Sequence, residues 1–551
     1  MNKGSTNKDI DIPLLHTEES ILGKPWLLVY KKNVEFEGQH FETAMSNLIK
    51  QPNINSTVIM RADILKENIY DPEKGDTMFV SKLINQIPEF PSSDESTILK
   101  RDLTDVELRS IPLDNSKIQL QPKFEIIRRI IPRNPFKDYI INQTCLVLTD
   151  DNTTNSSSNN NNDTILVVYI PHISSKDEIP FYLPEVYGVG ILYHKKSLSI
   201  HYLPFGYKQS DIEYNLVKNW DPTNRSIRIA LRLLETSAKH SNGVMAGYEK
   251  RVNHDMVVPK IAFQNRYISL KKKYSSNLVN SWIESTDPKK HVFEDLAIAA
   301  FLIEFWASLY KSKEDFEFRD LGCGNGLLVY ILNNEGYKGI GIDARARKSW
   351  TTYPEEVQKN LKEQVIIPSI LLKPHPAVAK MAPHIKDNGR YFQIPDSPSY
   401  YSSANLLASE KVCTLDDFPK NTFIIGNHSD ELTCWIPLLG FPYMVIPCCS
   451  HSVSGAKVRY NPRKSATQNS TYSSLVDHVE DLSITMGWDA KKEMLRIPST
   501  RNAAIIGSKR NINESLESYQ TRILDILALE GGTEGWVENS IALMKRPPRN
   551  H

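Results

Sequence analysis

The sequence of 551 residues predicts an α/β protein, with a doubly wound sheet in its C-terminal part and a mixed, β-rich domain before it. From Phe316 onward, short apolar runs of strand length alternate with helix-like stretches, which is typical of β-α-β units. Before that, between residues 119 and 205, β-branched runs follow one another with only turn residues between them. We therefore expect an N-terminal domain over residues 1–225 and a second domain over residues 226–551.

Three runs carry the strand signal of the N-terminal domain: "CLVLT", "ILVVYI" and "GVGILYHKKSLSIHYLPF". In the last run, Lys195, Lys196 and Ser197 are predicted to form the turn of a hairpin. Between the first two lies "DDNTTNSSSNNNNDT", a polar tract of low complexity. We expect a disordered loop near residues 150–164 at the tip of a hairpin, where extra length costs little.

Composition describes an ordinary globular protein, with 40% apolar and 24% charged residues and a formal charge of +1. This near-neutral charge argues against a nonspecific nucleic-acid coat protein. The six cysteines lack the spacing of a secreted disulfide framework, and the N-terminus lacks the apolar core of a signal peptide. The longest helix-like apolar stretch, residues 296–310, is shorter than the roughly 20 residues that span a bilayer. We expect a soluble, intracellular protein.

The second domain begins with helical periodicity from about Ser226, and a further helix is predicted in "FEDLAIAAFLIEFWASLY". The strand "FEFRDL" follows, then a glycine-rich turn, a helix to about Asn334 and the strand "GIGID". The runs "TFIIGNH" and "FPYMVIPCC" read as later strands of the same sheet.

The glycine-rich turn contains Gly322, Gly324 and Gly326. Glycines allow backbone N–H groups to approach a nucleotide, because side chains would block the approach. A dinucleotide fingerprint places its third glycine where this chain has Leu327, so the spacing is G-x-G-x-G. The alternative interpretations are a structural corner without a ligand and a dinucleotide site.

With Asp320 before the glycines, "DLGCGNG" resembles the first motif of class I S-adenosylmethionine-dependent methyltransferases. The resemblance implies that the turn holds the methionine end of S-adenosyl-L-methionine. It also implies that Asp343, at the end of the next strand, binds the ribose hydroxyls of this cofactor, since one carboxylate can accept from both. The expected cofactor-binding residues are Asp320, Gly322, Gly324, Gly326 and Asp343.

A polar cluster follows the strand "TFIIGNH", at the sheet edge where ligands bind in open α/β folds. His428 is a candidate base near neutral pH, and Asp430 and Glu431 are candidates for orienting a hydroxyl or taking its proton. The alternative is that the two acids cap the next helix and that His428 packs beside it. The Asp/Asn-Pro-Pro-aromatic motif of amino-group methylation is absent.

The next strand ends in Pro447 and Cys448, a dipeptide that pyrimidine C5-methyltransferases also carry. Their thiolate attacks the base, but the longer motifs of that class do not accompany it here. Cys448, Cys449 and His451 lack the paired spacings of a four-ligand zinc site, so no metal site is predicted. Buried thiols beside the pocket are the expected role.

Basic residues follow the same strand, without an acidic residue until Asp477. Such a run can contact phosphates, although charge runs usually form a solvated face. The expected substrate-binding residues are Lys457, Arg459, Arg463 and Lys464.

Five blocks occur in order between about Gly243 and Asn502, and together they resemble the eukaryotic tRNA (uracil-2′-O-)-methyltransferase family. They are "LKKKYSSNLVNSWIESTDPKKHVFEDLAIAAFLIEFW", "FRDLGCGNGLLVYILNNEGYKGIGIDARARKSW", "IIGNHSDELTCWIPLL", "IPCCSH" and "LRIPSTRN". The resemblance implies a Rossmann-like class I methyltransferase domain and a cytoplasmic enzyme that methylates the ribose of uridine 44 in serine tRNA.

Two other functions stay open at this point. One is an RNA base methyltransferase that uses Cys448, and the other is a noncatalytic cofactor-binding subunit of a tRNA-modification complex. Whether the N-terminal domain contacts the tRNA, and whether a helper protein takes part, also stay open.

Overall fold

The computed structural model describes residue 14 and residues 18–70, 79–83, 98–150, 163–208, 212–248, 254–395, 398–463, 470–512 and 515–544. The chain divides into two compact units, Met1–Lys250 and Arg251–His551. Within the described residues, no helix combines the length and the apolar character needed to cross a bilayer.

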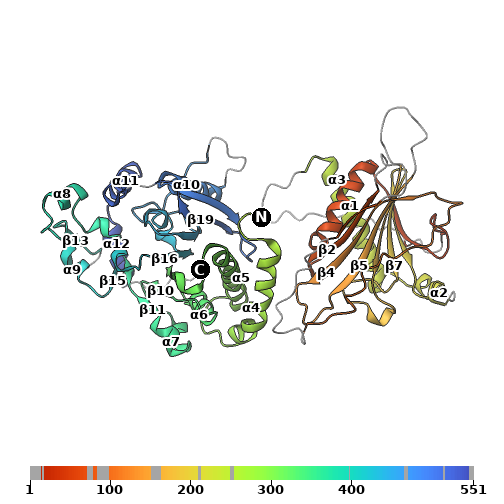
Figure 1. Cartoon of the computed structure of the whole chain (residues 1–551), viewed down its shortest axis with the longest axis horizontal. Helices are drawn as coiled ribbons and strands as arrows, with labels where there is room; N and C mark the ends of the chain where they lie inside the picture. Colours follow the sequence, from red (N-terminus) through yellow and green to blue (C-terminus); the bar gives the residue numbers. More distant parts are fainter. Residues whose placement is uncertain are drawn as a thin grey trace. The chain divides into compact units, whose positions relative to one another are not determined.

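The first unit is built on an eight-stranded antiparallel sheet with the order β1-β8-β7-β6-β5-β4-β2-β3 (Figure 1). The strands are β1 (Leu27–Asn33), β2 (Ile59–Tyr70), β3 (Phe79–Leu83), β4 (Gln121–Pro132), β5 (Ile141–Thr149), β6 (Thr164–Pro171), β7 (Gly188–His194) and β8 (Ser197–Leu203). The three predicted strand runs are confirmed. Lys195 and Lys196 form the β7–β8 turn with φ of 46° and 65°, values that suit a two-residue hairpin loop. Residues 151–162 of the predicted loop lie outside the described residues.

Both faces of this sheet are covered, which explains why β6 is apolar throughout rather than alternating. Ile165 and Val167 belong to the core beneath the helices α1 (Gly38–Lys50) and α3 (Arg225–Met245). Leu166 and Val168 point to the opposite face, where residues from 22–26 and 111–120 cover them. A short helix, α2 (Ile212–Lys218), precedes α3.

Helix α3 belongs to the first unit, so the boundary lies after Lys250 rather than after Arg225. Its apolar face, with Ile227, Ala230 and Leu234, is buried in the core of the N-terminal sheet. The helical period from Ser226 was interpreted correctly, but the sheet that the helix covers is the preceding one.

The second unit contains a seven-stranded sheet with the order β11-β10-β9-β16-β17-β19-β18. The first five strands are parallel, whereas β19 runs antiparallel to both of its neighbours. Their bounds are β9 (Glu317–Leu321), β10 (Gly339–Asp343), β11 (Leu361–Glu363), β16 (Thr422–Asn427), β17 (Tyr443–Ile446), β18 (Trp488–Met494) and β19 (Ala503–Arg510). Strand order reverses between β9 and β16, and such a switch point is where open α/β sheets bind ligands.

Helices cover both faces of this sheet, as the doubly wound prediction requires (Figure 1). One face packs against α4 (Lys260–Asn280), α5 (Pro288–Leu309) and α6 (Leu327–Asn334), and the other against α10 (Thr471–Thr485), α11 (Leu516–Leu529) and α12 (Trp536–Leu543). Helix α7 (Glu355–Lys359) directly precedes β11. Between β11 and β16 lie the helices α8 (Pro376–Met381) and α9 (Ser403–Leu407). The same segment contains two small strand pairs, β12 (Val365–Ile366) with β15 (Val412–Cys413) and β13 (Tyr391–Gln393) with β14 (Tyr400–Ser402).

Helix α5 is apolar on nearly all sides because it lies in the core between the sheet and its neighbours α4 and α6. Asp287 begins it as the N-cap, accepting a hydrogen bond from the Lys289 N–H at 2.9 Å, and Pro288 occupies the first helical position. Its few acidic residues therefore stand out as candidates for a role beyond packing.

The start of α4 is held by a buried carboxylate on β18. Glu493 accepts hydrogen bonds from the backbone N–H groups of Asp255, Met256 and Val257, each at 2.8 Å. Arg496 forms a bidentate ion pair with Asp255 at 2.8 and 2.6 Å. These contacts join the segment before α4 to the far edge of the sheet.

Candidate active site

The glycine-rich turn joins β9 to α6 at the switch point of the sheet. Gly322, Gly324 and Gly326 have φ of 80°, 54° and 74°, the left-handed region that glycine adopts at no steric cost. A Cβ on Gly322 would lie 3.4 Å from the Cα of Ser429, so the turn closely approaches the loop after β16. A Cβ on Gly324 would meet nothing within 4 Å, which leaves open space in front of the turn.

Side chains from the segment after β10 hold this turn from behind. The Trp350 indole N–H donates to the carbonyl of Gly324 at 2.9 Å. The Ser349 hydroxyl donates to the carbonyl of Asn325 at 2.8 Å, and the Tyr353 hydroxyl donates to the same oxygen at 3.1 Å. The shape of the turn is thus set by the protein itself, which reduces the entropy lost when a ligand binds.

Asp343 ends β10 and faces the turn. Its carboxylate accepts hydrogen bonds from the backbone N–H groups of Gly324 at 3.0 Å and Arg345 at 3.1 Å. Burial raises the pKa of Asp343, while the charges of Arg347 and Arg345 and both hydrogen bonds oppose this shift.

Asp320 ends β9, with only 2% of its surface exposed. Its Oδ1 is buried and has no hydrogen-bond partner among the residues that the structure describes. Burial, with a smaller contribution from the charge of Asp343, raises the pKa of Asp320 to about 8. A buried carboxylate oxygen without a donor is costly, so a cationic or hydrogen-donating ligand at this position would relieve the cost.

Helix α5 contributes two acids to the site that the sequence analysis did not single out. Asp295 lines the pocket and accepts a hydrogen bond from the side-chain amide of Asn427 at 3.3 Å. Burial, Glu294 and Asp320 together raise the pKa of Asp295 well above its ordinary value. The signal that could have identified them is that two adjacent acids stand at the start of the apolar stretch of this helix, where both are buried.

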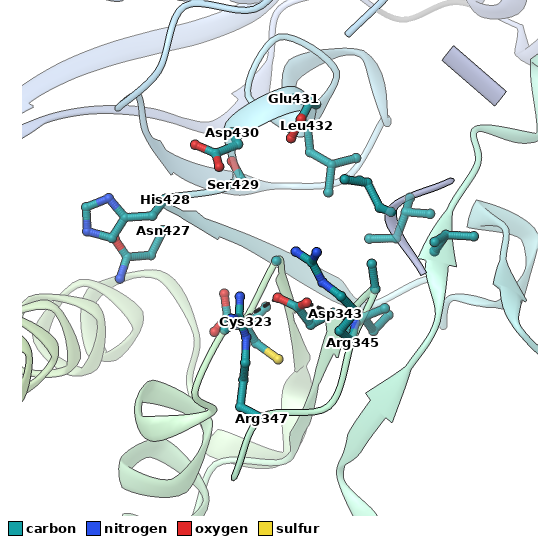
Figure 2. Close-up of a pocket in the computed structure, with 18 of the residues that line it drawn as sticks. Cys323, Asp343, Arg345, Arg347, Asn427, His428, Ser429, Asp430, Glu431 and Leu432 are labelled. Carbon is teal, nitrogen blue, oxygen red and sulfur yellow. Dashed lines mark hydrogen bonds between the residues drawn. The ribbon is translucent and has the colours of Figure 1, made fainter. Parts of the chain in front are cut away.

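The loop after β16 forms the opposite wall. His428 and Asp430 have φ of 56° and 43°, which is unusual for residues other than glycine and typical of strained functional loops. The His428 side chain is 32% exposed, and its Nε2 lies 3.1 Å from the Glu294 carboxylate, which is 3% exposed. Figure 2 shows the two walls facing each other: Asn427, His428, Ser429, Asp430, Glu431 and Leu432 on one side, and Cys323, Asp343, Arg345 and Arg347 on the other.

The adjacent Cys448 and Cys449 follow the end of β17. The Cys448 thiol donates a hydrogen bond to the Asp430 carboxylate at 3.3 Å. The interaction between the two thiols, together with burial and the charge of Asp430, raises the pKa of Cys448. Neither cysteine is among the residues that line the pocket, so Cys448 is poorly placed as a nucleophile.

The predicted basic residues have different surroundings. Lys457 is exposed and lines the pocket, and Arg459 is exposed nearby in the sequence. Arg463, in contrast, is paired with Glu480 at 2.8 Å and lies close to Asp481 on α10. The positive charge of Arg463 is therefore already paired within the protein, which makes this residue a poor candidate for phosphate binding. Lys464 lies outside the described residues.

The pocket between the two walls has a volume of about 360 Å³, within the usual range for small-molecule sites. All five predicted cofactor residues except Gly326 line it, and Gly326 instead begins α6. Helix α12, with Trp536, Asn539 and Ser540, also contributes to the lining, which the sequence did not indicate. These features suit S-adenosylmethionine. The amino group of this cofactor needs an acceptor such as the unpaired oxygen of Asp320, its methionine part needs the open glycine turn, and its ribose needs an acid such as Asp343.

Two family models match the chain. Residues 6–251 match one described as a TRM44-like, N-terminal bet v1-like domain, and residues 257–368 match one described as a predicted AdoMet-dependent methyltransferase. The second match contains the glycine turn and Asp343 and identifies the cofactor as S-adenosylmethionine.

The chain is also similar over its whole length to curated proteins named tRNA (uracil-O(2)-)-methyltransferase. The protein from Debaryomyces hansenii is 65% identical over 589 residues, which cover 99% of each chain. The protein from Saccharomyces cerevisiae is 52% identical over 577 residues, covering 100% of this chain and 99% of the relative. The one from Schizosaccharomyces pombe is 36% identical over 543 residues, covering 96% and 94%. Because this similarity extends across both units and includes the cofactor turn, the chain belongs to the tRNA (uracil-O(2)-)-methyltransferase family.

Proposed function

We propose that this protein is an enzyme that transfers a methyl group from S-adenosylmethionine to the ribose 2′-hydroxyl of a uridine in tRNA. The observation that carries this proposal is the pocket at the switch point. One of its walls suits the cofactor, and the other presents an imidazole and two carboxylates to a hydroxyl group.

Three residues of the cofactor wall would each contact a different part of S-adenosylmethionine. Asp320 would pair with the amino group of the cofactor through its orphaned oxygen, and Asp343 would accept from the ribose hydroxyls. Gly324 leaves room for the methionine part to lie against the backbone. When bound, S-adenosylmethionine supplies a methyl group activated by its positively charged sulfur.

On the acceptor wall, His428 is the proposed base. Its Nε2 donates to the Glu294 carboxylate, so Nδ1 is the nitrogen that remains to accept the proton of a hydroxyl. Glu294 acts through His428 as a positioning residue, because its buried carboxylate selects the tautomer and orientation of the ring. Asp430 and Glu431, which also line the pocket, would orient the ribose. Alignment of the hydroxyl with the methyl group supplies much of the catalysis.

The substrate is proposed to be uridine 44 of serine tRNA. The support for this tRNA and this position is the resemblance of the five sequence blocks to the family that methylates it. Lys457 and Arg459 would contact phosphates beside the pocket, whereas Arg463 is left out because of its ion pairs with α10. We also propose that the enzyme acts in the cytoplasm. The proposal includes contact between the N-terminal domain and the tRNA, and the participation of a helper protein.

The first test is incubation of the purified full-length protein with labelled S-adenosylmethionine and unmodified serine tRNA, followed by nuclease digestion and mass spectrometry of the nucleosides. We expect 2′-O-methyluridine, and its loss from a tRNA with a different nucleotide at position 44. Methyl on a pyrimidine ring would refute ribose methylation and restore Cys448 as a nucleophile. Cofactor binding without any product, even with cell extract added as a source of partners, would favour a noncatalytic subunit.

A second test separates the base from its positioning residue. General base catalysis contributes about 100-fold or more, so His428→Ala should lower kcat by that factor with little change in S-adenosylmethionine affinity. Glu294→Gln keeps the size of the side chain but changes the partner of His428, and kcat should fall roughly tenfold while KM for the cofactor stays the same. Glu284→Gln, another acid that lines the pocket, is the matched control. Unchanged kcat in His428→Ala would exclude this base.

A further inference from the structure

Three potential metal ligands converge at the acceptor wall, where Asp430 meets two cysteines that do not line the pocket. Asp430 follows β16, and Cys448 and Cys449 follow β17, the neighbouring parallel strand. A carboxylate oxygen and the two sulfur atoms all lie within 4.8 Å of one another. Parallel pairing brings these residues together because the ends of both strands lie at the same edge of the sheet.

The spacing of this cluster suits one tetrahedral ion. Zinc binds at about 2.3 Å from sulfur and about 2.0–2.2 Å from oxygen, so ligand atoms around it lie roughly 3.4–3.8 Å apart. The Cys448 sulfur is 3.3 Å from the Asp430 oxygen, and small side-chain rotations would complete the remaining distances. Two sulfur ligands favour zinc or another soft ion over magnesium or calcium.

The surroundings supply the charge that such a site needs. A divalent ion bound by two thiolates and one carboxylate carries one excess negative charge. Arg501 places its guanidinium 3.7 Å from the Cys449 sulfur, where it would neutralise this charge and hold the ligand in place. Cys449 is partly exposed, which gives the ion a route of entry and a side on which water can complete the coordination.

We propose that Asp430, Cys448 and Cys449 form a zinc-binding site that joins the loop after β16 to the end of β17. Both strand ends carry parts of the acceptor wall, so the ion would hold the unusual backbone of His428 and Asp430 in place. Asp430 also belongs to the proposed acceptor wall, and the two roles are compatible because Oδ1, the oxygen next to Cys448, would bind the ion and leave Oδ2 for the ribose. The sequence predicted no metal site because the carboxylate lies 18 residues before the cysteines and is joined to them only by strand pairing.

The test measures metal content rather than activity, so its outcome does not depend on the substrate assignment. Full-length protein without a histidine tag is purified in a reducing buffer free of chelators and analysed by inductively coupled plasma mass spectrometry. We expect about one zinc per chain. Cobalt titration of protein stripped of metal should give the near-ultraviolet charge-transfer absorption of cobalt–thiolate bonds.

Cys448→Ser and Cys449→Ser should each reduce the zinc content and weaken the cobalt band. Cys413→Ser is the matched control, because Cys413 is a buried cysteine of the same unit outside the cluster. Wild-type protein that holds less than about a tenth of an equivalent of zinc and gives no thiolate band with cobalt overturns the proposal. Metal that persists in the double cysteine variant overturns it as well. The cobalt titration of the wild type decides the question even where a variant fails to fold.

Discussion

Replacing Asp320 with asparagine should remove most of the pH dependence of S-adenosylmethionine binding. The carboxyl group has a pKa of about 8 in the protein, because it is buried and lies near Asp343. The amino group of the cofactor is a cation below pH of about 8, so the ion pair forms only after Asp320 loses its proton. At pH 7 that loss costs about 1.4 kcal/mol, and each further unit of acidity adds the same amount.

The affinity of the wild type should therefore rise nearly tenfold from pH 6 to pH 7. It should rise only a few-fold from pH 7 to pH 8, because Asp320 is then close to half ionised and the amino group of the cofactor begins to lose its proton. Asp320→Asn should bind the cofactor at least roughly tenfold more weakly at pH 8, and the difference should shrink as the pH falls. The two affinities should converge only below about pH 6, where binding to the neutral wild-type carboxyl group becomes the main form of binding. Asp295 and Asp343 also have raised pKa values and add to the slope in both proteins, so the difference between the two isolates Asp320.

Isothermal titration calorimetry provides the assay, with each pH repeated in two buffers of different ionisation enthalpy to count the protons released on binding. We expect close to one proton at pH 6 from the wild type and fewer from the variant. A wild-type affinity that is flat across this range, or an equal slope in Asp320→Asn, would refute the assignment of Asp320 to the amino group.

Three further predictions follow from other parts of the second unit. Asp343→Ala removes the proposed acceptor of two ribose hydroxyls and should weaken cofactor binding about a hundredfold or more in equilibrium binding with labelled S-adenosylmethionine; unchanged affinity would contradict the proposed site. Lys457→Ala should weaken tRNA binding and reduce the steepness of log K against log salt concentration by about 0.7–0.9. Arg463→Ala should leave that slope unchanged, because the charge of Arg463 is already paired within the protein. Equal slopes for the two variants would show that Lys457 makes no phosphate contact. Glu493→Ala leaves three backbone N–H groups without their acceptor and should lower the free energy of unfolding, measured by urea denaturation, by about 3 kcal/mol or more. The control is Asp489→Ala, at an exposed position of the same strand, which should change the free energy of unfolding by less than about 0.5 kcal/mol. Similar effects of the two substitutions would exclude the anchoring role of Glu493.

Several elements show how far local sequence determined the fold. The run "ILVVYI" is apolar at every position and was correctly predicted as a strand, β6, although only the structure shows that both of its faces are covered. Helix α3 was predicted from its period but was assigned to the wrong unit. Periodicity reports which face of a helix is buried, and it carries no information about which sheet buries that face.

The same distinction applies to charged residues. Arg463 belongs to a basic run that predicted phosphate contacts, but its partner Glu480 lies on α10, later in the sequence than residues 464–469. Glu294 and Asp295 lie in a stretch that the sequence analysis predicted to be a helix, without naming any residue of it as part of the site. Their position at the pocket depends on how α5 packs against the sheet beside β16, which is a long-range property.

By itself, the sequence determined the cofactor turn and its two acids. These features depend on residues within about 25 positions of one another, and their chemistry is set by local backbone conformation and by the strands that immediately flank them. Only the tertiary structure decided what faces the turn. The pairs Glu294 with His428, Asp295 with Asn427, and Asp430 with Cys448 join residues on different elements. They meet because parallel strands bring their carboxyl ends to one edge, and because packing, rather than any local pattern, selects the helix that lies beside that edge.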